Sequence, residues 1–260
     1  MRRMLFAIAF VVPGFVPTDL AFAQHHQSQG HGSASPSAVH TSDTAFSTTV
    51  FGAFLAMMHK KDHGPKVSLD APSMTGMTHA VGALTDLRGE VSLIDGKPIV
   101  SYGTSCTTCP PAHGEKATLL IAAKVTSWMP PLVLPDDLAG HALDRFIIEQ
   151  ARKAGLDMAK PFPLRVKGKL TNVAMHVIRA PNPQFGGHGS GQPMALQEDI
   201  KTPAIDGEVV GFYAPEQLLG VITHPGEPFH YHWVDAGRTR TAHLDAFGMA
   251  KGAELHFPKQ

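Results

Sequence analysis

The chain has 260 residues, of which 43% are hydrophobic and 17% charged, and its formal net charge is zero. This is enough apolar material for one large domain, or for two small ones that share a core. The balanced charge and the lack of a basic run give no support to a nucleic-acid-binding protein.

The first 23 residues have the pattern of a secretory signal peptide. A positively charged start precedes an apolar stretch from Met4 to Val16, and Ala21 to Ala23 forms an A-x-A cleavage site. Prolines interrupt the apolar stretch, which argues against a transmembrane helix. We therefore predict cleavage after Ala23, export to the periplasm or secretion, and no membrane attachment of the mature protein.

Residues 24–43 are polar and low in complexity, with histidines at positions 25, 26, 31 and 40. They cannot bury enough apolar surface to fold, so we expect a disordered tether, with metal scavenging as the alternative. Residues 44–260 are expected to form the folded domain, with 44–160 and 161–260 as candidate sub-domains.

The first half of this domain is predicted to combine one helix with several strands. Apolar residues recur at helical spacing from Thr44 to Lys60, which predicts an amphipathic helix. The segment from His79 to Tyr102 alternates as strands do, and Asp95-Gly96 is a strong hairpin signal inside it. Ala117 to Thr126 is a strongly apolar strand candidate.

The two cysteines of the chain, Cys106 and Cys109, are separated by two residues. In an exported protein we expect a local disulfide that closes a loop. A soft-metal site shared with His113 is the second interpretation. Dithiol redox catalysis is the third, because Pro110 and Pro111 forbid the helix that would follow such a motif.

The second half is predicted to contain the best helix of the chain, from Pro135 to Leu156, with acidic residues in its first turn and basic residues in its last. Strands outnumber helices, so the predicted class is α+β, built mainly on antiparallel or mixed sheet. The expected strands after the helix are 164–170, 172–179, 208–214, 220–223 and 253–257.

The most informative stretch is FHYHWVDAGRTRTAHLDAF, which contains His230, His232 and His243. Alternate side chains of a strand point to one face, so His230 and His232 should project together, about 6–7 Å apart. A turn at Asp235 to Arg238 would return the chain and bring His243 opposite them. Three histidines with an open position are the ligand set of a catalytic zinc site, whereas exposed histidines on an aromatic strand are the simpler alternative.

This stretch, with GEVVGFYAPEQLLGV before it and HAVGALTDLRGEVSLIDGK further upstream, resembles the α-acetolactate decarboxylase family. The resemblance spans about residues 45–257 and is most specific in the histidine block. It implies that the fold is that of the family and that His230, His232 and His243 hold Zn²⁺. It also implies that Glu90, in Arg88-Gly89-Glu90, is the active-site glutamate, and that Arg165, in LRVKG, lies beside the substrate.

The reaction implied by the resemblance is loss of CO₂ from 2-acetolactate to give acetoin. The partner would be a small 2-hydroxy-2-oxoalkyl carboxylic acid, and the family suggests a homodimer. Zinc would stabilise developing negative charge, a partly buried glutamic acid would deliver the proton, and the guanidinium would hold the carboxylate. From the residues alone, the alternative for Glu90 is a solvated residue at the start of a strand, and the alternative for Arg165 is an ordinary surface charge.

The chain departs from the family pattern at several positions. Thr241-Ala242 stand where the family carries Gly-Gly, and Ala83 stands where it carries threonine. The family's second glutamate, in its C-terminal tail, has no clear counterpart, since Glu254 is the only acid nearby.

Two other functions stay open from the sequence. A non-catalytic zinc- or copper-binding protein of the cell envelope is suggested by 16 histidines and 11 methionines. A cupin-type enzyme is the third reading, but Ala236 and Gly237 stand where cupins carry a glutamate after their HxH.

Overall fold

The structure is a computed structural model that describes residues 39–42, 45–102, 112–187 and 191–260. These residues belong to one compact unit, 36–260. Antiparallel strands dominate the described residues and helices are few, which confirms the predicted α+β class. None of the described helices has the length and apolarity needed to cross a membrane. The predicted signal peptide, most of the predicted tether, and Cys106 and Cys109 lie outside the described residues.

The first sheet has seven strands in the described part of the chain, in the order β1-β2-β7-β4-β5-β6, with β3 also paired to β7. The predicted hairpin is confirmed, because Asp95 and Gly96 join β5 to β6 with φ values of 50° and 78°. The strands are β1 (Val39–Ser42), β2 (Phe46–Phe51), β3 (Val67–Ser68), β4 (His79–Leu84), β5 (Glu90–Ile94), β6 (Lys97–Ser101) and β7 (Lys116–Val125).

The second sheet also has seven strands among the described residues, in the order β8-β14-β10-β11-β12-β13-β9. Strand β13 pairs with β10 as well as with β12. The strands β10, β11, β12 and β13 therefore form a closed ring of pairings. The strands are β8 (Leu132–Val133), β9 (Leu138–Ala139), β10 (Phe162–Pro181), β11 (Ala195–Tyr213), β12 (Phe229–Val234), β13 (Thr241–Met249) and β14 (Glu254–His256).

The two α-helices of the described residues are short. The predicted helix at 135–156 is confirmed in its main part as α2 (Gly140–Lys153), which buries Leu143, Ile147 and Ala151. Its predicted start is wrong, because Leu138 and Ala139 form a strand and no acidic residue lies in the first turn of the helix. The predicted helix from Thr44 to Lys60 is wrong in its first half: this segment forms β2 and only then α1 (Phe54–Lys60). Threonines and aromatic residues in β2 favour a strand, and its pairing with β7 outweighs the helical spacing.

Four predicted strands are corrected. The expected strands 164–170 and 172–179 are one strand, β10, which continues through Asn172 at a φ of 49°. The strand expected at 208–214 begins earlier, at Ala195, because β11 pairs with β10 along most of its length. Residues 220–223 form a turn and no strand, and β1 begins inside the segment expected to be a tether.

The main core lies between the two sheets. Alternate residues of the first sheet, such as Val81 and Ile121, pack with Val209 and Val210 of the second sheet. Their neighbours Ala80 and Leu120 point the other way, into a smaller core on the far face of the first sheet. The first sheet is therefore buried on both faces, which explains why β7 reads as a continuous apolar run.

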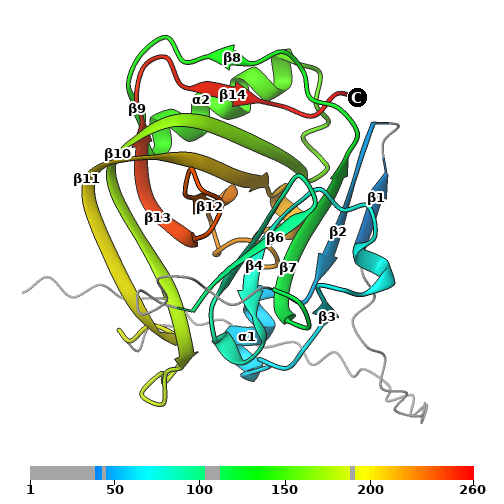
Figure 1. Cartoon of the computed structure of the whole chain (residues 1–260), viewed down its shortest axis with the longest axis vertical. Helices are drawn as coiled ribbons and strands as arrows, with labels where there is room; N and C mark the ends of the chain where they lie inside the picture. Colours follow the sequence, from blue (N-terminus) through cyan, green and yellow to red (C-terminus); the bar gives the residue numbers. More distant parts are fainter. Residues whose placement is uncertain (1–38, 43–44, 103–111, 188–190) are drawn as a thin grey trace, which may run out of the picture. The chain divides into compact units, whose positions relative to one another are not determined.

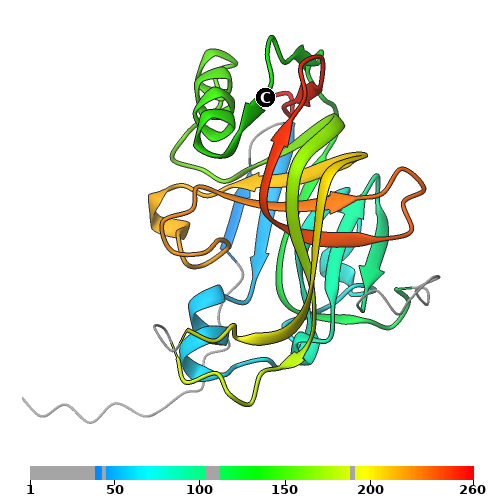
Figure 2. The same cartoon turned by 90° about the vertical axis from the view of Figure 1, so that its left-hand side faces the viewer.

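Figure 1 shows β10 and β11 as a long, curved pair of strands. In Figure 2 the far end of this pair reaches the level of α1. There Ile178 and Ala195 pack with Phe54, Met57 and other apolar residues in a third cluster. This end of the long hairpin adjoins the candidate site described next.

Candidate active site

The three predicted histidines come together in the structure. His230 and His232 lie on one face of β12, and His232 pairs directly with His243 on β13. Each ring offers a nitrogen, and the three nitrogens all lie within 4.8 Å of one another. His230 and His232 are buried and His243 is half-buried. The strand spacing and the turn therefore placed this group correctly.

The tautomer of His230 follows from one hydrogen bond. Its Nδ1 lies 2.7 Å from the carbonyl oxygen of Ile222, which can only accept. The Nδ1 nitrogen therefore carries the hydrogen. The Nε2 nitrogen is left with a free lone pair, which is the form that binds a metal.

The tautomer of His232 follows from a chain of hydroxyl groups. The hydroxyl of Thr241 donates to the carbonyl oxygen of Trp233 at 3.0 Å, so its oxygen accepts from the Ser92 hydroxyl at 2.6 Å. Since the hydrogen of Ser92 is then used, its oxygen accepts from His232 Nδ1, 3.1 Å away. The lone pair of His232 is therefore also on Nε2.

The buried histidines favour their neutral forms. Burial lowers the pKa of His230 to about 4, with a smaller opposing effect from the Ile222 carbonyl. Burial, followed by the other histidines, lowers the pKa values of His232 and His243 well below the ordinary value. Neutral imidazole is the ligand form, so the three rings are ready to bind a cation at neutral pH.

The donor set fits a metal ion. The Nε2 atoms of His230 and His232 are 3.2 Å apart, and in the tautomers above neither carries a hydrogen. Two lone pairs that face each other at this distance repel unless a positive charge lies between them. Three neutral imidazoles are ligands that suit zinc, copper, iron or nickel.

Glu90 lies next to this group, on β5 of the other sheet. Its carboxylate is 3.6 Å from His232 Nε2 and accepts a 3.4 Å hydrogen bond from the backbone of Ile178. Burial raises the pKa of Glu90 to about 7, against the lowering effects of His176 and the Ile178 N–H. A carboxyl group in this range can hold a proton near neutral pH and release it.

His176 lies beside the three histidines and is held by Asp245, and sequence reasoning missed both residues. His176 lies on β10 opposite His243, with ring centroids 4.9 Å apart, and its Nδ1 is 2.8 Å from Asp245. Burial disfavours its charged form, but Asp245 and Glu90 together raise the pKa of His176. Asp245 follows His243 by two residues, so strand alternation could have placed it on the same face. Nothing in the sequence pointed to the pairing of β10 with β13.

A cavity of about 270 Å³ opens onto these groups. Its polar end contains Glu90, His176, His230 and His243, together with His224, whose ring lies 5.8 Å from that of His243. Burial lowers the pKa of His224 as well. A buried carboxyl group and a potential metal site thus share one space that a small molecule can enter.

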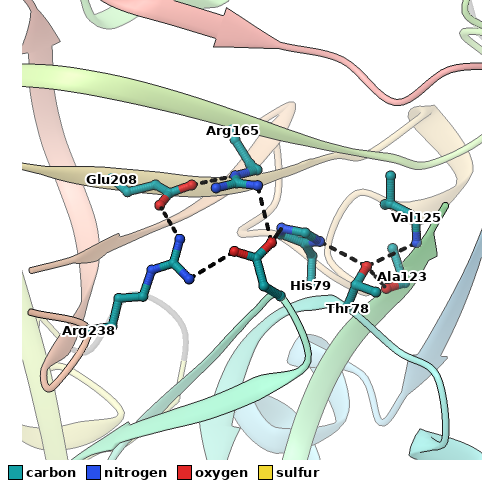
Figure 3. A network of polar contacts seen from close by, with 8 residues as sticks. Thr78, His79, Ala123, Val125, Arg165, Glu208 and Arg238 are labelled. Atoms are coloured by element: carbon teal, nitrogen blue, oxygen red, sulfur yellow. Dashed lines mark hydrogen bonds and ion pairs between the residues drawn. The ribbon is translucent and has the colours of Figure 1, made fainter. Parts of the chain in front are cut away.

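The structure does not bring Arg165 to this cavity. Arg165 is buried, contacts Glu208, and lies 3.3 Å from Asp95. Arg238 contacts the same two carboxylates, at 2.8 Å from Asp95 and 3.5 Å from Glu208. Figure 3 shows this closed network with His79 beside it. Eleven residues of β10 separate Arg165 from His176, roughly 36 Å of extended chain, which is why the two do not meet.

Comparison with known proteins identifies the family of the chain. A family model described as alpha-acetolactate decarboxylase matches residues 75–258. No curated protein sequence matches the chain.

Three solved structures share the fold at low sequence identity. The α-acetolactate decarboxylase of Bacillus subtilis strain 168 is 16% identical over 76% of this chain and 80% of its own, with a TM-score of 0.59. A Staphylococcus aureus protein of unknown function, described as similar to that enzyme, is 18% identical over 81% and 85%, with a TM-score of 0.58. The acetolactate decarboxylase of Bacillus subtilis subspecies spizizenii is 15% identical over 76% and 81%, also at 0.58.

Proposed function

Since the chain belongs to the α-acetolactate decarboxylase family, we propose that it removes CO₂ from 2-acetolactate, or a close 2-hydroxy-3-oxo acid, to give a hydroxyketone. One observation supports this most directly: two of the three clustered histidines, His230 and His243, line the same cavity as the buried carboxyl group of Glu90. A metal-storage protein has no need of a substrate-sized cavity or of a proton donor beside its ligands.

We assign the metal ligands to His230, His232 and His243, with Zn²⁺ as the ion. When bound there, zinc would act as a Lewis acid towards the oxygens of the substrate. The chain's contribution is to hold the three rings in their ligand tautomers, through Ile222 for the first and Ser92 for the second. Such supporting hydrogen bonds orient ligands and tune their basicity.

We assign proton delivery to Glu90. When CO₂ leaves, the substrate carbon that carried it needs a proton, and the donor has to lie in the cavity without occupying the metal position. Glu90 meets this condition, since it lines the cavity and reaches within 3.6 Å of His232. A positioned acid of this kind contributes about 10²–10⁴-fold to the rate.

We place His176 on the substrate side of the cavity, where Asp245 fixes the orientation of its ring. It can hydrogen-bond a substrate oxygen and adds positive potential near the substrate carboxylate. The family resemblance seen in the sequence gave this role to Arg165. In the present proposal Arg165 has no contact with substrate.

The test is a comparison of purified residues 24–260 with His232→Ala and His141→Ala variants. His141 is a matched control because its side chain is 95% exposed. We expect acetoin from racemic 2-acetolactate, one zinc per chain, and loss of both in His232→Ala alone. Full activity or full metal content in His232→Ala would overturn the assignment.

A further inference from the structure

The cavity has a second, apolar end that decarboxylation of a small acid does not explain. The wall there is a separate hydrophobic cluster, distinct from the two cores of the sheets. All of its members line the cavity. They are Phe54, Met57, Met58, Ala83, Leu87, Leu119, Ile178 and Ala195, with Phe185 and Met194 packed against them.

One side of this apolar end is the helix α1, which is fixed in place. The backbone N–H groups of Phe54 and Leu55 donate to the carbonyls of Val221 and Gly220 at 2.9 and 3.0 Å. Gly220 has a φ of +75°, and a Cβ there would lie 2.8 Å from Leu55. The left-handed backbone at this position favours glycine, and the two hydrogen bonds hold Phe54, Met57 and Met58 against the cavity.

The other side is formed by strands of both sheets. Ile178 of β10 and Ala195 of β11 come from the end of the long hairpin, and Leu119 comes from β7. Ala83 faces Glu90 across the β4–β5 pair, so the apolar wall begins directly beside the proposed proton donor. The polar and apolar ends are thus continuous.

This space extends beyond the polar groups. Its volume of about 270 Å³ lies just below the range of about 300–1,000 Å³ typical of sites for drug-sized molecules, and the apolar cluster forms much of its wall. The only apolar substituents of acetolactate are methyl groups. Its oxygens belong at the polar end of the cavity, where the histidines and Glu90 lie. It would leave the wall formed by Phe54, Met57 and Leu119 without a partner.

We propose that this chain acts on 2-hydroxy-3-oxo acids whose substituent at carbon 2 is a larger apolar group, such as a longer alkyl or an arylalkyl chain. This inference rests on the proposed function. The bond between carbon 1 and carbon 2 breaks, CO₂ leaves, its bonding electrons pass to the 3-oxo group, and carbon 2 takes one proton. The product is the matching larger hydroxyketone, and no oxidant or reductant is needed.

The expected selectivity follows from apolar burial. Each methylene that enters the apolar end is worth about 0.8 kcal/mol, which is about a fourfold gain in affinity. A substituent with three more methylenes than methyl should therefore bind on the order of 60-fold more tightly, until the cavity is full.

The experiment uses two matched series of acids on the metal-loaded chain. Decarboxylation is followed by CO₂ release from 2-hydroxy-3-oxo acids with methyl, butyl and phenylethyl groups at carbon 2. Binding is measured by calorimetry on 2-hydroxy-2-methylpropanoate and its butyl and phenylethyl counterparts, which lack the 3-oxo group and cannot react. Affinity and kcat/KM should both rise with substituent size.

Substitutions in the wall of the apolar end test whether the preference for large substituents arises there. Ala195→Phe fills the apolar end and should abolish the preference for large groups while the methyl acids still bind. Leu119→Phe, on a different strand, makes the same test if Ala195→Phe does not fold. Leu196→Ala is the control, because this neighbour is 44% exposed and does not line the cavity.

The two proposals fail in different ways. Affinity that rises with size, but no CO₂ from any acid, would support the apolar site and overturn the decarboxylase assignment. Turnover of acetolactate with no gain in affinity or kcat/KM for larger groups would overturn the apolar site alone. A size preference that persists in both filled variants would also overturn it.

Discussion

His232 is held in one tautomer by a relay of two hydroxyl groups, Ser92 and Thr241, that ends at a backbone carbonyl. The relay joins two strands of one sheet to a strand of the other. The hydroxyl of Thr241 orients the relay, because it is the group that bonds to the backbone carbonyl. Its removal should weaken metal binding without touching a ligand.

We predict that Thr241→Val lowers zinc affinity about 10–100-fold, the usual effect of losing a group that supports a ligand. Valine has nearly the shape of threonine but cannot accept from Ser92, so His232 loses the fixed partner of its Nδ1. Competition with a chromophoric chelator would measure the change. The control is Thr202→Val, whose hydroxyl bonds only to Ala204 among the described residues. Equal affinities in the two variants would contradict the relay.

For Glu90→Gln we predict a fall in kcat of about 10²–10⁴-fold with zinc content unchanged, since glutamine cannot supply the proton. Glu149→Gln is the matched control on an exposed face, where the side chain is 62% accessible. Stopped-flow CO₂ release and metal analysis on the same samples would separate the two effects. A kcat within a few-fold of the parent would remove Glu90 from the mechanism.

At this scale, strand alternation and one turn were enough to predict the three histidines, because all three lie on neighbouring strands of one hairpin. Glu90 came only from the family resemblance, since nothing local shows that β5 of one sheet packs against β12 of the other. His176 and Asp245 could not be found in this way. They meet through the register of β10 with β13, a pairing between segments almost 70 residues apart.

At the scale of elements, the hairpin turn between β5 and β6 is tied to the second sheet by the network of Figure 3. Arg165 of β10 and Arg238 of the β12–β13 turn both reach Asp95 and Glu208. The guanidinium of Arg165 also lies 5.4 Å from the ring centre of Trp128. The two arginines share their partners but differ in burial.

We predict that Arg165→Met costs about 3–5 kcal/mol of unfolding free energy, because it leaves the buried Glu208 carboxylate without its closest partner. Arg238→Met should cost less than about 1 kcal/mol, since the Arg238 side chain is 36% exposed and water can replace it. Urea unfolding of the two variants measures the difference. Equal costs would contradict the structural role of Arg165. A lower kcat in folded Arg165→Met would return it to the catalytic groups that the sequence comparison indicated.

Long strands were harder to predict from the sequence than short ones. The hairpin at Asp95-Gly96 was clear because turn chemistry is local. The continuity of β10 through Asn172 and the early start of β11 depend on pairing over most of their lengths, and charged residues on the exposed face hide that pairing. The β2 segment has apolar residues that fit either a helix or a strand, and only its neighbour β7 decides between them.

The unfolding free energy of the whole molecule should decrease at low pH, and part of this decrease comes from His79, which is buried between the two sheets. Burial, and next the charge of Arg165, lower the pKa of His79 to about 3, while Asp95 opposes this and Arg238 adds to it. The unfolded chain has the ordinary value of about 6.5. The native state therefore keeps His79 neutral where the unfolded state takes up a proton, so this stability is complete above about pH 6.5 and is lost as the pH falls.

As the pH falls from about 6 to about 4, we predict that the unfolding free energy of the parent decreases by about 1.4 kcal/mol per pH unit more than that of His79→Gln. Denaturant unfolding at several pH values would give the two slopes. His141→Gln, whose ring is exposed and has no comparable environment, should follow the parent. Parallel slopes for parent and His79→Gln would show that the unfolding free energy does not depend on this proton.

We propose that one ion held by His230, His232 and His243 makes this chain a decarboxylase. The direct measurement is a zinc titration of the chelator-stripped full chain, with CO₂ release from 2-acetolactate, and from its larger homologues, recorded at each addition. Activity should be absent at the start, rise linearly, and level off at one equivalent of zinc per chain. Activity in the stripped protein, or a metal-saturated protein that releases no CO₂ from any of these acids, would contradict the claim.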